Sequence, residues 1–130
     1  MAENRNPTTN NPGAVFVATG QGQFLHFSLT AGGPTAVFTF TSNVEGTLWE
    51  PADFPGPPKT LYEWDHLRNP SDIQQLELLT LALAFFSNAQ YTYTVDLCDR
   101  AGTVLQTVMN IQYTGSPTDY TFESLRVIIQ

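Results

Sequence analysis

Hydrophobic and polar residues occupy alternate positions over most of the chain. Apolar side chains recur at every second residue in the segments 15–17, 25–29, 37–41, 91–97 and 125–129. A period of two among β-branched and aromatic residues indicates extended strands with one buried face. Glycine-rich breaks at 20–22 and 31–34 separate the first of these segments, because glycine allows the positive φ of tight reversals. The pattern therefore predicts an all-β chain.

The C-terminal half carries the clearest hairpin signal. The sequence Asp99-Arg100-Ala101-Gly102 places an acceptor at the start of a turn and a glycine at its end. The run that follows is expected to direct four side chains to one face: Leu105, Met109, Ile111 and Tyr113. Short strands at this spacing predict an antiparallel β-sandwich of about seven or eight strands.

Segment 71–87 fits two structures. Ser71 and Gln74 form a capping box before an apolar run, which favours a single helix. The alternation and the neighbouring strands favour a strand instead, in which Leu76 and Leu78 point inward before a kink. Beyond the kink, the side chains expected inside are Leu79, Leu81, Leu83 and Phe85. Residues 87–90 would then connect this strand to the next one as a hairpin.

The domain organisation is simple. Residues 1–12 are rich in Asn, Thr and Pro with little to bury, which predicts a flexible N-terminal arm. Residues 13–130 are expected to form a single β-sandwich domain, since a chain of 130 residues can bury a core of its own. Cys98 is the only cysteine, so neither an intrachain disulfide nor a cysteine-based zinc cluster is expected.

Charge narrows the choice of partners. Five basic residues stand against twelve acidic ones, for a net charge of -7. Because nucleic-acid binding depends on cationic contacts to phosphates, no nucleic-acid partner is expected, and an anionic membrane surface is disfavoured for the same reason. The apolar stretch 76–86 is too short to cross a bilayer, so no integral membrane segment is expected. The polar N-terminus shows no signal peptide, which leaves a cytoplasmic location or export by another route.

The segment 43–70 differs from the rest of the chain. It lacks periodicity, contains five of the nine prolines and holds both tryptophans. Long loops of this kind are uncommon in compact domains and are often functional. Aromatic and polar side chains on a stiffened loop are suited to a glycan or a protein partner. The expected ligand-binding residues are Trp49, Phe54, Tyr62, Trp64, Asp65, His66 and Arg68. The alternative is that the two tryptophans only cover an open end of the sandwich.

Candidate chemistry is sparse. His66 follows Asp65, but adjacent residues rarely point at one atom, and His26 is 40 positions away without a metal-binding spacing. There is no calcium-binding array, no nucleophile motif and no phosphate loop. The sequence therefore predicts no catalytic residues, no metal site, no cofactor and no enzyme activity.

Three functions follow from these patterns. The first is a non-catalytic binding module that presents the loop 43–70 to a glycan or a protein. The second is a self-assembling structural subunit and homo-oligomer, because lysine is nearly absent from the strands and edge strands lack their usual charged protection. The third is a membrane-acting, toxin-like protein in which 76–86 and 91–97 rearrange as an amphipathic hairpin.

Overall fold

The computed structural model describes residues 2–3, 14–31, 36–50, 53, 61–66, 76–85, 89–116 and 119–129. Within these residues the chain forms strands and one short 3-10 turn at Thr19–Gln21, without an α-helix. The strands are β1 (Ala2–Glu3), β2 (Ala14–Val17), β3 (Phe24–Ala31), β4 (Ala36–Ser42), β5 (Gly46–Trp49), β6 (Leu61–His66), β7 (Leu76–Phe85), β8 (Ala89–Cys98), β9 (Val104–Gly115) and β10 (Asp119–Ile129).

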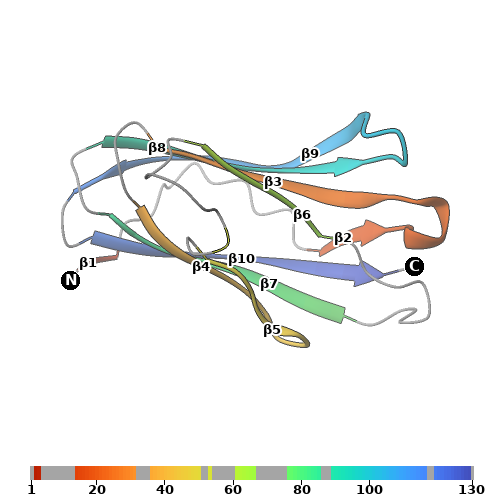
Figure 1. Cartoon of the computed structure of the whole chain (residues 1–130), viewed down its shortest axis with the longest axis horizontal. Coiled ribbons are helices and arrows are strands. Elements are labelled where there is room, and N and C mark those ends of the chain that lie inside the picture. The colour runs from red at the N-terminus through yellow and green to blue at the C-terminus, as the bar shows by residue number, and fades with distance from the viewer. Residues whose placement is uncertain are drawn as a thin grey trace.

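Two sheets pack face to face as a β-sandwich (Figure 1). The six-stranded sheet has the order β1-β10-β7-β4-β5, with β2 also paired to β10, and the four-stranded sheet has the order β6-β3-β8-β9. All pairings are antiparallel except those of β1 and β2 with β10, which are parallel. The predicted all-β sandwich is confirmed. The strands outnumber the predicted seven or eight partly because segment 43–70 contributes both β5 and β6.

The core follows from the alternation. Side chains at every second position of β3, β8 and β10 are buried between the sheets, as the sequence predicted. Aromatic rings fill its centre, where Trp64 stacks on Phe27 and Phe38 with interplanar angles of 1° and 9° and contacts Phe40 at a centroid distance of 5.2 Å. Burial of such large rings is the main favourable contribution to the stability of this fold.

Strand β7 corrects two predictions. It is extended over Leu76–Phe85, so the helix alternative is wrong for these residues. The alternation also runs through it without a kink, which leaves Leu76 and Leu78 exposed and buries Glu77 completely. The cause is the pairing with β10, whose register is unbroken from Tyr120–Ala84 to Ile128–Leu76. Alternate side chains of β7 therefore stay on the same face along the whole strand.

The link between β7 and β8 is a further correction. These strands lie in different sheets, so they do not form the predicted hairpin. Strand β7 pairs with β4 and β10, whereas β8 pairs with β3 and β9. The amphipathic hairpin of a membrane-acting protein is therefore not a unit of this sandwich. The described residues contain no helix with the length and apolarity to span a bilayer.

The buried and exposed side chains of β9 do not alternate regularly along the whole strand. Met109, Ile111 and Tyr113 are buried as predicted, but Leu105 is 51% exposed. The pairing with β8 shifts register between Val95 and Asp96, where Val108 is the extra residue of β9, and again between Leu97 and Cys98, where Leu105 is the extra residue. The first bulge moves the side chains just before it to the opposite face, and the second leaves Leu105 outside the regular pairing.

The hairpin turn between β8 and β9 is confirmed. Oδ1 of Asp99 accepts hydrogen bonds from the N–H groups of Ala101 and Thr103, both at 2.9 Å. Gly102 has a φ of 86°, the left-handed conformation that favours glycine.

The predicted arm 1–12 is described only in part. Ala2 and Glu3 pair in parallel with Asp119 and Tyr120 of β10. Residues 4–13 lie outside the described part of the chain, so the flexibility of the arm stays a prediction.

Candidate functional site

Strand β6 separates the predicted binding residues into two groups. Tyr62, Trp64 and His66 point into the sandwich, and their exposed fractions are 5%, 3% and 7%. Asp65 lies on the outer face, where its carboxylate is accessible. The alternation along β6 thus places Tyr62 and Trp64 in the core, and Trp64 packs among the central rings rather than over an open end of the sandwich.

The remaining predicted residues lie nearer the surface or outside the description. Trp49 ends β5 and is half-buried against the core. Beyond it, the N–H of Glu50 donates to Oδ2 of Asp53 at 2.9 Å, and the N–H of Asp53 donates to the carbonyl of Glu50. Phe54 and Arg68 are outside the described residues. The structure therefore brings His66 and Tyr62 close to Trp64 along one strand but does not gather the seven residues at one surface.

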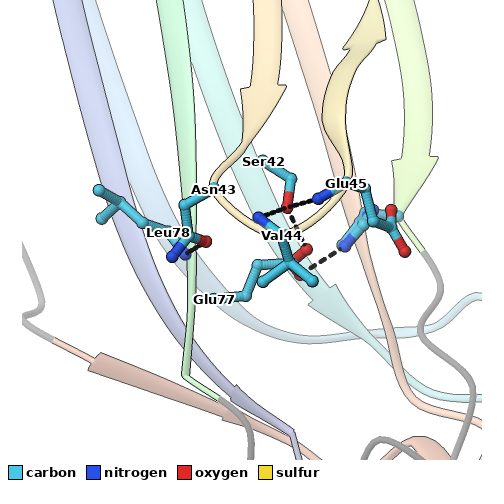
Figure 2. Close-up of polar contacts among 7 residues, drawn as sticks. Ser42, Asn43, Val44, Glu45, Glu77 and Leu78 are labelled. Carbon is cyan, nitrogen blue, oxygen red and sulfur yellow. Dashed lines mark hydrogen bonds and ion pairs between the residues drawn. The ribbon is translucent and has the colours of Figure 1, made fainter.

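A buried carboxylate forms the centre of the main polar cluster. Oε1 of Glu77 lies 2.7 Å from Nε2 of His66. Its Oε2 accepts a hydrogen bond from Oγ of Ser42, as Figure 2 shows. Glu77 is fully buried and Ser42 is 4% exposed. A buried carboxylate is tolerated only when it is hydrogen-bonded or paired, and here both of its oxygens have partners.

The turn between β4 and β5 encloses this cluster. The N–H groups of Val44 and Glu45 donate to Oγ of Ser42, at 3.1 and 3.2 Å (Figure 2). Asn43 fastens the turn to β7, since its N–H donates to the carbonyl of Leu78 and its Oδ1 accepts from the N–H of Leu78 at 2.7 Å. Backbone and side-chain bonds therefore hold the turn against the start of β7.

The order of the groups decides what this cluster can do chemically. In a nucleophilic triad the histidine touches the nucleophile, but here Glu77 stands between Ser42 and His66. Ser42 directs its hydrogen to Glu77 and accepts two backbone N–H groups, so its oxygen is not poised for attack. The arrangement favours a structural or ion-binding role over acyl transfer.

Glu45 brings a second carboxylate to this end of the sandwich, beside His66 and Glu77. The donor atoms of Glu45, His66 and Glu77 all lie within 4.8 Å of one another. Glu45 is exposed, whereas His66 and Glu77 are buried. The cluster is therefore open to solvent on the side of the β4–β5 turn.

The outer face of the four-stranded sheet is mostly polar and acidic, with Leu61 of β6 as an exposed apolar residue on it. His26 lies opposite Asp65 of β6 and Asp96 of β8 in the strand register. Nδ1 of His26 is 2.6 Å from Oδ1 of Asp65, and Nε2 is 3.7 Å from Oε1 of Glu63. Asp96 accepts a hydrogen bond from Oγ1 of Thr107 at 2.8 Å. Three carboxylates thus surround one imidazole on this face.

The outer face of the six-stranded sheet has the opposite character. Phe16 and Leu76 are each 53% exposed, Phe122 is 50% exposed and Leu78 is 37% exposed. Their outward-facing neighbours are small or uncharged: Thr39, Thr41, Thr80, Ala82, Ala84, Tyr120, Ser124 and Ile128. Among the outward-facing positions of β2, β4, β7 and β10, Arg126 is the only charged residue. We call this surface the apolar face.

A groove crosses the apolar face. It has a volume of about 570 Å³ and lies over the small residues Ala82 and Ala84 of β7. Tyr120 and Phe122 of β10 line it, with their rings edge to face at a centroid distance of 5.4 Å. Thr39 of β4 lines it as well. An aromatic ridge therefore runs beside a groove floored by small side chains.

Cys98 is unsuited to covalent chemistry. Burial raises the pKa of its thiol, and the charges of Asp96, Asp65 and Asp99 raise this pKa further. Because the thiolate is the nucleophilic form, a raised pKa lowers the reactivity of the thiol.

Sequence reasoning missed Glu77 and the apolar face for one reason. Both depend on the phase of β7, and the assumption that leucine points inward required a kink that the strand does not have. A strict alternation through Leu76-Glu77-Leu78 would have placed the carboxylate inside and two leucines outside.

Comparisons of this chain with protein-family models, with curated proteins and with solved structures found no match.

Proposed function

We propose that this chain is a non-catalytic structural subunit that associates with a second copy of itself through the apolar face. The observation that carries the proposal is the contrast between the two outer surfaces of the sandwich. One surface carries Glu63, Asp65 and Asp96 around His26, and the other exposes Phe16, Leu76 and Phe122. Exposed apolar groups gathered on one face are typical of protein interaction sites.

The charge of the chain favours a second copy that approaches by this face. Two copies with a net charge of -7 repel one another most where their carboxylates meet. The outward-facing positions of β2, β4, β7 and β10 hold no carboxylate, and their one charged residue is the cation Arg126. Glu3 of β1 pairs with Tyr120 at the edge of this face. The stem of an arginine can cover apolar surface while its guanidinium reaches water at the rim.

The shape of the face is suited to a two-fold arrangement. A two-fold interface uses the same patch on both subunits, so every ridge needs a complementary groove on that same patch. The ridge of Tyr120 and Phe122 lies directly beside the groove over Ala82 and Ala84. In a two-fold pair, the ring of Phe122 from each copy enters the groove of the other.

Two opposing free energies govern association through the apolar face. Burial of apolar surface contributes about 25 cal/mol per Å², and each aromatic ring at an interface adds its full contact area. Loss of translational and rotational freedom opposes association by about 4–15 kcal/mol. We therefore expect a dimer that dissociates on dilution rather than a permanent one.

Sedimentation velocity over a concentration series of about 1 to 300 µM, a range that brackets micromolar dissociation constants, tests the proposal. The wild type is expected to shift from monomer to dimer, and Phe122→Glu is expected to stay monomeric. Thr92→Glu adds the same charge to the outer face of the opposite sheet and is the matched control, expected to dimerise. A wild type that is monomeric throughout, or a Phe122→Glu variant that dimerises like Thr92→Glu, would overturn the proposal.

A second function is favoured by the way the segment 43–70 is held. Glu77 bonds Ser42 just before this segment and His66 near its end, so one buried side chain anchors both ends to β7. We propose that the anchored segment binds a glycan or protein partner, with Trp49 and Asp65 as its accessible contacts. Tyr62 and Trp64 act in this proposal as core supports, and Phe54 and Arg68 stay as predicted contacts.

A pull-down and a glycan array with wild type, Trp49→Ala and Thr92→Ala test this second function. A ligand bound by wild type and Thr92→Ala but lost in Trp49→Ala supports it. A ligand retained by Trp49→Ala, or no ligand for the wild type, counts against it. Far-UV circular dichroism of each variant separates loss of binding from loss of fold.

A further inference from the structure

Three side chains that can bind a metal ion converge at one end of the sandwich. Glu45 comes from the β4–β5 turn, His66 from the end of β6 and Glu77 from the start of β7. Their donor atoms lie within 4.8 Å of one another, and two of these side chains are buried. The β4–β5 turn and β7 belong to the six-stranded sheet, whereas β6 belongs to the four-stranded sheet.

We propose that Glu45, His66 and Glu77 form a site for a divalent transition-metal ion of the zinc type. The site lies apart from the apolar face, because it is built from inward-facing and turn residues at the end of the sandwich. It is also independent of the dimer proposed above.

The donor set selects the class of metal. One imidazole nitrogen and two carboxylate oxygens suit zinc and related ions, while calcium and magnesium prefer oxygen donors alone. Zinc bonds to nitrogen and oxygen are about 2.0–2.2 Å long, so the donors of one site lie roughly 3–3.6 Å apart. The 2.7 Å contact between His66 and Glu77 and the 4.8 Å limit for the group bracket this spacing. The separations of the three donors are therefore close to those of a zinc site, in which a fourth position is open to water.

A divalent cation suits the charge of this site. A divalent ion at the same place balances both Glu45 and Glu77, and it does so next to buried groups, where electrostatic attraction is less screened.

The surrounding bonds already orient one ligand. Ser42 donates to Oε2 of Glu77, which holds the carboxylate with Oε1 toward His66. The N–H groups of Val44 and Glu45 fix Ser42 in turn. Outer bonds of this kind position metal ligands and raise affinity. Glu45 is exposed, so an ion can enter from solvent past this side chain.

A bound ion would cross-link the two sheets. The chain has one cysteine and therefore has no disulfide within it to hold them. Because the three ligands meet only in the folded chain, metal binding is expected to stabilise the fold.

The test measures thermal unfolding of the full chain, first treated with a chelator and then titrated with ZnCl₂. Zinc at a hundredfold excess over its dissociation constant is expected to raise the Tm of the wild type by about 5 °C or more. Glu45→Gln removes the accessible ligand without disturbing the buried pair, and it is expected to weaken zinc binding by at least about tenfold. His26→Gln removes the other histidine, which lies on the outer acidic face, and is expected to respond as the wild type does.

Cobalt absorption gives a second readout that does not depend on stability. Co²⁺ bound to wild type and to His26→Gln should show visible d–d bands that are lost in His66→Gln. The inference is overturned if zinc raises the Tm of Glu45→Gln as much as that of wild type, if the response disappears in His26→Gln, or if the wild type shows neither effect. Dimerisation of Glu45→Gln should be unchanged, so failure of the metal site is distinguishable from failure of the dimer.

Discussion

Nε2 of His66 lies 2.7 Å from Oε1 of Glu77, and this contact joins the two sheets of the sandwich at a point where both side chains are buried. His66 belongs to the four-stranded sheet and Glu77 to the six-stranded one. Removal of one member leaves a buried polar group without this partner. Removal of both allows an apolar contact to take its place.

His66→Leu is expected to lower the free energy of unfolding by about 3–5 kcal/mol, because the buried Glu77 carboxylate loses its pairing imidazole. The double variant His66→Leu/Glu77→Leu should recover a large part of this loss. Urea denaturation of the single and double variants, in the presence of a chelator, measures both effects. A double variant that is less stable than His66→Leu would contradict the interpretation.

The two tryptophans are expected to differ in their contribution to stability. Trp64 is 3% exposed and stacks between Phe27 and Phe38, so Trp64→Ala should cost about 3–5 kcal/mol. Trp49 is only half-buried, and Trp49→Ala should cost clearly less. Chemical denaturation compares the two variants directly, and equal losses would show that Trp49 is also a core residue.

Gly102 is expected to be the more sensitive of two turn glycines. Its φ of 86° is unfavourable for a residue with a Cβ, so Gly102→Ala should destabilise the β8–β9 hairpin by about 1–2 kcal/mol. Gly20 has no close neighbour for an added Cβ and does not have a positive φ, so Gly20→Ala is the matched control. Thermal unfolding of both should lower the Tm only in Gly102→Ala, and a Tm that stays at the wild-type value in both variants would be inconsistent with strain at Gly102.

Stability should fall in alkaline solution because of Tyr93. Burial raises the pKa of Tyr93, and the charge of Glu123 raises this pKa further. The folded protein therefore keeps the phenol proton at a pH where the unfolded chain has lost it. The resulting stabilisation is complete below the unfolded pKa of about 10 and is lost above it, by about 1.4 kcal/mol per pH unit for one tyrosine.

Denaturant titrations from neutral pH to above pH 10 measure this slope. Tyr93→Phe removes the ionisable group, and its stability should fall less steeply with pH than that of the wild type. Burial and Glu123 also raise the pKa of Tyr113, so a residual slope is expected in the Tyr93→Phe variant. Parallel curves for wild type and Tyr93→Phe would exclude Tyr93 as the cause.

The buried face of a strand could be predicted wherever nearly all of its large apolar residues lie at alternate positions. In β8 the larger apolar side chains share one phase, and in β3 only Phe24 falls on the other, so the buried face followed from the sequence. In β7 leucines occupy both phases, and the pattern alone did not choose between them. The choice came from pairing with β4 and β10, which requires a single unbroken register. Strand β6 was missed because prolines surround it, although Tyr62, Trp64 and His66 do alternate with exposed residues.

The order of residues alone determined that this chain forms a sandwich of strands, because a period of two between apolar and polar side chains can be satisfied only by extended backbone with one buried face. Tertiary structure decided which residues meet. Ser42, His66 and Glu77 are up to 35 positions apart, and they come together only because β4 and β6 end, and β7 begins, at the same end of the two sheets. The apolar face was decided in the same way, since the outward phase of β7 and β10 depends on strand pairing and not on the hydrophobicity of any one residue.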